Sequence, residues 1–172
     1  MNAEILRDTY VSALRNTHAL EEEALQIMQR QVERIENYPE MRDALHHHIG
    51  ETEEQRRRIE EALSDLSESP STIKEAMMGL TGNIAALAHA PAQDEILKNT
   101  FANHAFENYE IAAYRSLIAI AEAAGAQRHL SALRSSLSEE EAMAQRVSDQ
   151  IETITRRYLT LTASGEGSGA KI

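Results

Sequence analysis

The sequence predicts an all-α protein, a four-helix bundle folded as a single domain, on three observations. Its 172 residues are rich in Ala, Leu, Glu, Arg and Gln, which are strong helix formers. Apolar residues, 42% of the chain, recur at intervals of three and four positions along four long segments, which is the period of an amphipathic helix. The 7 Gly and 3 Pro residues mostly lie between those segments, so the helical pattern is seldom interrupted.

Helix start and stop signals divide the chain into its expected elements. The signals are Pro39, Pro70, Pro91 and Gly125. The long helices that we expect span residues 3–36, 40–66, 92–123 and 127–161. A shorter amphipathic helix is expected at 72–88. The bundle therefore occupies residues 1–162, and the Gly/Ser-rich segment 163–172 is expected to be a disordered tail.

The connection lengths predict the topology of the bundle. Helices one and two, and helices three and four, are joined by short turns, so each pair forms an antiparallel hairpin. The connection between helices two and three is long, and one long crossover in an otherwise up-down bundle is the ferritin-like topology. A weak internal duplication agrees with two related hairpins, because the segment 16–21 resembles the segment 102–107.

Composition excludes several classes of function. The net charge is −11, which disfavours a nucleic-acid partner, because phosphate binding needs clustered Lys and Arg. Cysteine is absent, so disulfides, zinc–thiolate sites and Cys nucleophiles are impossible. We find neither a signal peptide at the start nor an apolar run long enough for a membrane span, so we expect a cytoplasmic protein without a membrane partner.

Three glutamates occupy positions where the helical pattern calls for buried apolar residues. Glu140 fills a gap in the apolar stripe of the fourth helix, and Glu21 and Glu107 do the same near the middle of the first and third helices. An isolated buried carboxylate must be protonated, hydrogen-bonded, paired with a cation or bound to a metal. Neither Lys nor Arg lies on the same stripes nearby, and carboxylate oxygens suit iron or manganese.

The depth of these glutamates in the bundle favours a shared site. Counted from the two hairpin turns, Glu21, Glu107, Glu140 and Glu51 fall within about one helical turn of the same level. We therefore predict one or two metal ions bound between the helices. The alternative is a non-catalytic interaction protein in which the glutamates form a polar layer that fixes helix register.

The second helix fits this pattern less well. His48 lies near the centre of its apolar stripe, whereas Glu51 lies at the flank, so the pair contributes as His-x-x-Glu or not at all. Glu54 is expected to form a surface ion pair with Arg58. Glu110, one turn beyond Glu107, is either an additional ligand or exposed to solvent.

Two further histidines precede interior glutamates by three residues. His18 stands before Glu21, and His104 stands before Glu107. Either ring could orient the carboxylate that follows it. The other interpretation is an ordinary capped or exposed histidine, and the sequence leaves both open.

Several motifs resemble the YciF/YciE-type ferritin-like stress-protein family of bacteria. They are the segments 16–21, 48–52, 106–114 and 137–141, of which Glu107-x-Tyr109-Glu110-Ile111-Ala112-x-Tyr114 is the most specific. The resemblance covers about residues 3 to 155 and implies a ferritin-like bundle, a homodimer, a possible di-metal centre and a link to stress. Carried over by position, the ligands that it implies are Glu21, Glu51, Glu107 and Glu140.

One departure from the wider superfamily bears on activity. Its di-iron members carry Glu-x-x-His on two helices, and that motif occurs nowhere in this chain. Whether the protein is an enzyme therefore stays open, and a carboxylate-rich iron or manganese site of one or two ions is the leading hypothesis. The Gly/Ser tail in place of a further C-terminal helix favours a dimer over a cage.

Overall fold

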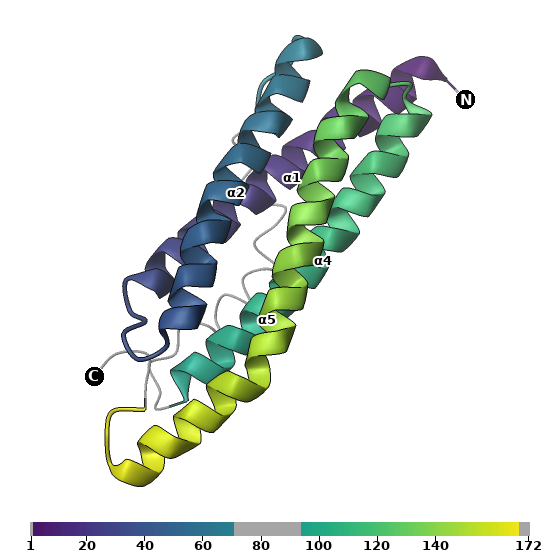
Figure 1. The fold of residues 1–172 in the computed structure, drawn as a ribbon. Coiled ribbons are helices and arrows are strands. Elements are labelled where there is room, and N and C mark those ends of the chain that lie inside the picture. The colour runs from purple at the N-terminus through teal and green to yellow at the C-terminus, as the bar shows by residue number, and fades with distance from the viewer. Residues whose placement is uncertain (1, 71–93, 169–172) are drawn as a thin grey trace.

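The computed structural model describes residues 2–70 and 94–168, and this part of the chain is a bundle of four long helices (Figure 1). The elements are α1 (Ala3–Val32), α2 (Pro39–Asp65), α4 (Glu95–Ala123), the 3₁₀ turn η1 (Gln127–His129) and α5 (Leu130–Ser164). The predicted all-α four-helix bundle is confirmed. The short helix expected at 72–88 lies outside the described residues.

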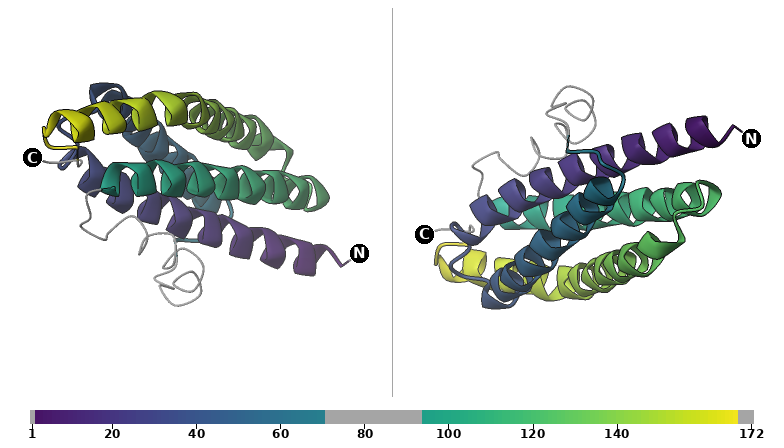
Figure 2. Two further views of the ribbon diagram at one scale, coloured as in Figure 1. Left: turned by 90° about the horizontal axis from the view of Figure 1, so that it is seen from below. Right: turned by 90° about the horizontal axis from the view of Figure 1, so that it is seen from above.

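The helices form two antiparallel hairpins, as the connection lengths predicted. α1 and α2 make the first hairpin, and α4 and α5 make the second (Figure 1). Across the bundle, α1 packs against α4 and α2 packs against α5 (Figure 2). The C-terminal end of α2 and the start of α4 lie at opposite ends of the bundle, so the second hairpin begins where the first hairpin turns. No described helix is long and apolar enough to cross a membrane.

Several helix boundaries differ from the expected ones, among them the end of α1 and both ends of α5. α1 ends at Val32 and not at 36, because the chain turns there and places Ile35 and Tyr38 in the core. α5 begins at Leu130 after the 3₁₀ turn and continues to Ser164, where Gly165 ends it in the left-handed conformation with φ 76°. Glycine adopts this conformation without the steric penalty of a side chain.

The apolar core is divided into two clusters along the bundle. One cluster lies around the α1–α2 turn; its largest members include Leu20, Met28, Tyr38, Met41, Leu45, Ile96, Phe106 and Val147. The other lies at the opposite end; its members include Tyr10, Leu14, Ile59, Leu63, Tyr114, Leu117 and Leu133. Between the two clusters, every helix buries polar residues; they include Thr17, Glu21, His48, Thr52, Gln55, Glu107, Glu110, Ser136 and Glu140. We call this set the polar layer.

Polar contacts also tie the helices near both ends of the bundle. Near the α1–α2 turn, the buried amides of Gln31 and Asn103 donate to each other across α1 and α4, at 3.0 and 2.9 Å. At the other end, the Tyr10 hydroxyl lies 2.9 Å from Nδ1 of His129, whose Nε2 lies 3.2 Å from Asp65. These contacts help fix the axial register of the helices, and with it the level at which the polar layer forms.

Candidate metal centre

Four side chains of the polar layer converge on one point inside the bundle. They are His48 of α2, Glu107 and Glu110 of α4, and Glu140 of α5. Each offers one nitrogen or oxygen atom, and these atoms all lie within 4.8 Å of one another. All four residues are buried, so the atoms face the interior and not bulk water.

The helical period explains how α4 and α5 bring their carboxylates to this point. Glu107 and Glu110 are three residues apart, so they lie on neighbouring turns of one face of α4. Glu140 stands on the inward face of α5 between Ser136 and Met143, which are also buried. Glu110 is 1% exposed, so the structure excludes the solvent-exposed position that the sequence had left open for it.

His48 lies between the carboxylates. Its Nε2 is 3.2 Å from Oε2 of Glu107 and 3.5 Å from Oε2 of Glu140, and its Nδ1 is 2.9 Å from Oε2 of Glu51. Burial alone would lower the pKa of His48, but the neighbouring carboxylates Glu107, Glu140 and Glu51 outweigh burial and raise the pKa well above its usual value. The converging group therefore contains a side chain able to carry positive charge, which the search of the sequence for Lys and Arg missed.

Burial and mutual repulsion raise the pKa values of Glu107 and Glu110, which favours the protonated forms of these two carboxyl groups. Desolvation raises the pKa of Glu107 to about 7, with His48 acting against this shift and Glu140 adding to it. The pKa of Glu110 is raised well above its usual value by burial and then by the charges of Glu140, Glu21 and Glu107. Releasing these protons without a compensating cation would leave several negative charges in an apolar surrounding.

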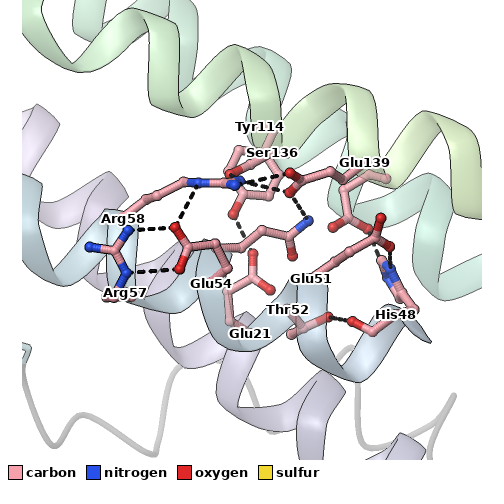
Figure 3. A network of polar contacts seen from close by, with 12 residues as sticks. Glu21, His48, Glu51, Thr52, Glu54, Arg57, Arg58, Tyr114, Ser136 and Glu139 are labelled. Atoms are coloured by element: carbon pink, nitrogen blue, oxygen red, sulfur yellow. Dashed lines mark hydrogen bonds and ion pairs between the residues drawn. The ribbon is translucent and has the colours of Figure 1, made fainter. Parts of the chain in front are cut away.

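Glu21 lies at the edge of the centre and not among the four converging groups. Its Oε1 accepts a hydrogen bond from the Tyr114 hydroxyl at 2.5 Å, and its Oε2 has no hydrogen-bond partner among the described residues (Figure 3). Burial, and next the charge of Glu140, raises the pKa of Glu21 well above its usual value. Glu21 thus has one oxygen held by the protein and one oxygen available.

Tyr114 is the residue near the centre to which sequence reasoning gave no role. It was placed on the apolar stripe of its helix, and it is fully buried there. A buried tyrosine hydroxyl requires a hydrogen-bond partner, and Glu107, seven residues earlier, marks the same face of α4. This spacing is the signal in the sequence that could have indicated its contact with the carboxylate layer.

The carboxylates just outside the centre are paired with cations. Arg58 donates to both carboxylate oxygens of Glu139, at 2.7 and 3.0 Å, and Gln55 donates to the same carboxylate at 3.1 Å (Figure 3). Glu54 pairs on the surface with Arg57 and lies 3.7 Å from Arg58. The surface role expected for Glu54 thus agrees with its contacts, although its nearer partner is Arg57.

The remaining candidates have other partners. Glu51 contacts His48 through one oxygen and the exposed His47 through the other, at 2.9 and 3.3 Å, and does not join the converging group. Hydrogen bonding to His48 lowers the pKa of Glu51. His18 lies 2.9 Å from Glu60 of α2, so its ring is held by that residue.

Several buried atoms of the centre lack a hydrogen-bond partner among residues 2–70 and 94–168. They are Oε2 of Glu21, Nε2 of His48, Oε2 of Glu107, Oε1 of Glu110, and both Oε1 and Oε2 of Glu140. Buried polar atoms in folded proteins are nearly always satisfied, so such a concentration calls for an occupant. Three carboxylates and one imidazole form a donor set that fits a divalent transition metal such as iron or manganese.

Comparisons with known proteins agree with the helical fold and with the family that the sequence motifs resemble. The model of a family described as a domain of unknown function, DUF892, matches residues 5–160. Protein YciF of Escherichia coli strain K12 is 28% identical over 148 residues, which cover 83% of this chain and 87% of YciF. These matches confirm the family resemblance seen in the sequence motifs.

Solved structures resemble this one over nearly their whole length. A protein of Xanthomonas campestris pv. campestris is 28% identical with a TM-score of 0.78, covering 92% of this chain and 99% of that protein. The structure described as the E. coli stress protein YciF has a TM-score of 0.71 at 24% identity, covering 85% of this chain and 94% of that one. At 24% identity, the likeness to the YciF structure shows a shared fold.

Proposed function

This chain belongs to the DUF892 family, a domain of unknown function, and from that premise we propose that its function is to bind divalent iron or manganese inside the helical bundle. The ligands would be His48, Glu107, Glu110 and Glu140, with Glu21 available for a second ion. The site takes one or two ions in this proposal. If the ion is iron, the chemistry that it supplies is oxidation of Fe(II) by oxygen or peroxide.

The observation that carries this proposal is the group of buried ligand atoms without hydrogen bonds. Each unsatisfied buried polar atom costs about 1–3 kcal/mol, and more if it is charged. Such a cost within one layer is hard to reconcile with a purely structural role. A divalent cation would supply a partner for each atom and remove the repulsion among the carboxylates.

Other features complete the proposal. The E. coli relative is described as a stress protein, and we extend a stress-related role and a cytoplasmic location to this chain. We also place it in a homodimer. The outer face of α4 supports this: Phe101 is 54% exposed, and the outward positions Ala105, Ala112 and Ala119 are small enough to let a second copy approach.

Metal analysis of the purified protein tests the metal site. After reconstitution with Fe(II) or Mn(II) without oxygen and removal of excess ion, the wild type should retain metal and the Glu107→Ala/Glu140→Ala variant should not. Glu122→Ala/Glu141→Ala is a matched control, because it removes two exposed carboxylates from the same two helices. Equal metal content in all three proteins would end the proposal.

A second candidate is a non-catalytic interaction protein whose polar layer fixes helix register. One observation favours it: His48 approaches Glu107 and Glu140 closely enough to pair with them without a metal. Thermal unfolding separates the two candidates, because an ion that binds only the folded state must raise the unfolding midpoint. Unchanged midpoints with Fe(II), Mn(II) or chelator would support the interaction protein.

A further inference from the structure

The two ring nitrogens of His48 have different surroundings. Nδ1 lies 2.9 Å from Oε2 of Glu51, which is 26% exposed at the flank of α2. Nε2 is buried, has no hydrogen-bond partner among the described residues, and faces Glu107 and Glu140. The ring therefore spans the distance from the surface of the bundle to the converging ligand atoms.

Helix geometry explains why Glu51 can hold the ring in this position. Residues 48 and 51 lie on neighbouring turns, so the Glu51 carboxylate can reach the outer nitrogen while the ring itself points inward (Figure 3). Thr52, the next residue, donates its hydroxyl hydrogen to the backbone carbonyl of His48 at 2.9 Å. The sequence alone had allowed both His48 and Glu51 to be ligands.

The hydrogen bond also decides which nitrogen is available to a cation. When the N–H of Nδ1 donates a hydrogen bond to a carboxylate, Nε2 carries the lone pair, and the negative charge of the carboxylate makes that lone pair a better donor to a metal. Without Nε2 the converging group would consist of carboxylates alone, which suit Mg(II), Ca(II) and Mn(II). An imidazole nitrogen shifts the preference toward Fe(II) and Co(II).

We propose that Glu51 is a positioning residue that presents Nε2 of His48 to the metal and thereby makes the centre select Fe(II)-like ions over Mg(II) and Mn(II). This inference rests on the proposed function, because it assigns the selectivity of the same site. In this inference Glu51 is not a direct ligand: of the His-x-x-Glu pair on α2, His48 donates to the metal and Glu51 orients its ring.

Cobalt(II) titration of chelator-stripped protein tests this role, because Co(II) absorption reports on nitrogen ligation. We expect Glu51→Ala to weaken Co(II) binding by about 10–100-fold and to change the Co(II) spectrum toward that of His48→Ala. Mg(II) affinity should change much less. Compared with Glu51→Ala, Glu51→Gln should recover part of the Co(II) affinity and the wild-type spectrum, because its amide oxygen can still accept a hydrogen bond from the N–H of Nδ1.

Glu54→Ala is the matched control, since Glu54 lies one turn further along α2 and its ion-pair partners among the described residues are Arg57 and Arg58. It should bind Co(II) as the wild type does. A Glu51→Ala variant with wild-type affinity and spectrum would overturn the inference, and so would a Glu51→Gln variant no better than Glu51→Ala. If Glu51→Ala lowered the affinities for Co(II) and Mg(II) equally, Glu51 would be a direct ligand, and this result would also overturn the inference.

The two proposals fail in different ways. If the wild type binds no Co(II), Fe(II) or Mn(II), or binds them as well after Glu107→Ala/Glu140→Ala, the metal site itself is wrong and the role of Glu51 is wrong with it. If the wild type binds and only the Glu51 variants behave like the control, the metal site stands and the positioning role is wrong.

Discussion

Glu139 and Glu140 are adjacent on α5, yet they lie in opposite electrostatic surroundings. Glu139 is partly exposed and accepts hydrogen bonds from Arg58 and Gln55 of α2. Glu140 is fully buried, and neither of its oxygens has a hydrogen-bond partner among the described residues. The Glu139 carboxylate links α5 to α2, whereas the two oxygens of its neighbour Glu140 lie in the core without a hydrogen-bond partner among the described residues.

The comparison shows that burial alone does not mark a functional carboxylate. A buried or half-buried glutamate with a matched cation is satisfied by the protein, as Glu139 is by Arg58. Glu107 and Glu140 share His48, and atoms of Glu107, Glu110 and Glu140 remain without a hydrogen-bond partner among the described residues. Substitutions of the paired Glu139 and of the converging glutamates can test this contrast, because they should change stability in opposite directions.

The largest effect is expected from metal itself. In chelator the wild type should unfold at a lower temperature than with Fe(II) or Mn(II), because only the folded state assembles the ligands. At a free metal concentration about a thousandfold above the dissociation constant, the gain in the free energy of unfolding is about 4 kcal/mol. Differential scanning calorimetry measures it. Glu107→Ala/Glu140→Ala should show no gain, and a gain equal to that of the wild type would contradict the assignment.

Replacing one unsatisfied carboxylate by an apolar side chain should stabilise the metal-free protein. Met is close to Glu in size and removes the orphaned oxygen of Glu110, so we expect Glu110→Met in chelator to raise the free energy of unfolding by roughly 1–3 kcal/mol. Urea unfolding measures the change. Glu139→Met is the counterpart and should destabilise, because Arg58 loses its partner. If both substitutions changed the free energy of unfolding in the same direction, the distinction between Glu110 and Glu139 would be wrong.

The metal-free protein should lose stability as pH rises. The pKa of Glu107 is about 7 in the folded protein against an ordinary value of 4.5, so between these values the folded state binds more protons than the unfolded chain. The raised pKa of His48 acts in the same direction above its own ordinary value. The free energy of unfolding should therefore fall, on the order of 2 kcal/mol between about pH 5 and about pH 7.5.

Urea unfolding in chelator across this range checks the pH dependence. Glu107→Gln should flatten it, because the amide does not titrate. Stability that rises with pH in the wild type would show that the interior carboxylates are ionised in the folded, metal-free protein.

The smallest change in the free energy of unfolding is expected from breaking the ion pair between Arg58 and Glu139. Arg58→Met leaves Glu139 with Gln55 as its remaining side-chain partner, and because the pair is partly exposed the loss should be about 1 kcal/mol. Metal retention should stay at the wild-type level, since Arg58 lies outside the converging group. Loss of metal in this variant would show that the α2–α5 ion pair helps to assemble the centre.

The helical period of the sequence determined the fold and most of the inward-facing residues. Apolar residues at three- and four-residue spacing predicted four long helices, and Pro39 and Gly125 marked the hairpin turns. The exact helix ends were less predictable. α1 ends at Val32, and the chain beyond it places Ile35 and Tyr38 in the core, where their burial depends on the neighbouring helices.

For the centre, the sequence by itself determined that Glu21, Glu107 and Glu140 are buried, because a position on a helix fixes the face on which its side chain lies. Only the tertiary structure decided what each inward atom meets. The rotation and axial shift of α2 against α5 place His48 among the carboxylates, leave Glu51 behind it, and pair Glu139 with Arg58. Those contacts depend on distances between helices, and a one-dimensional pattern within each helix contains no such distances.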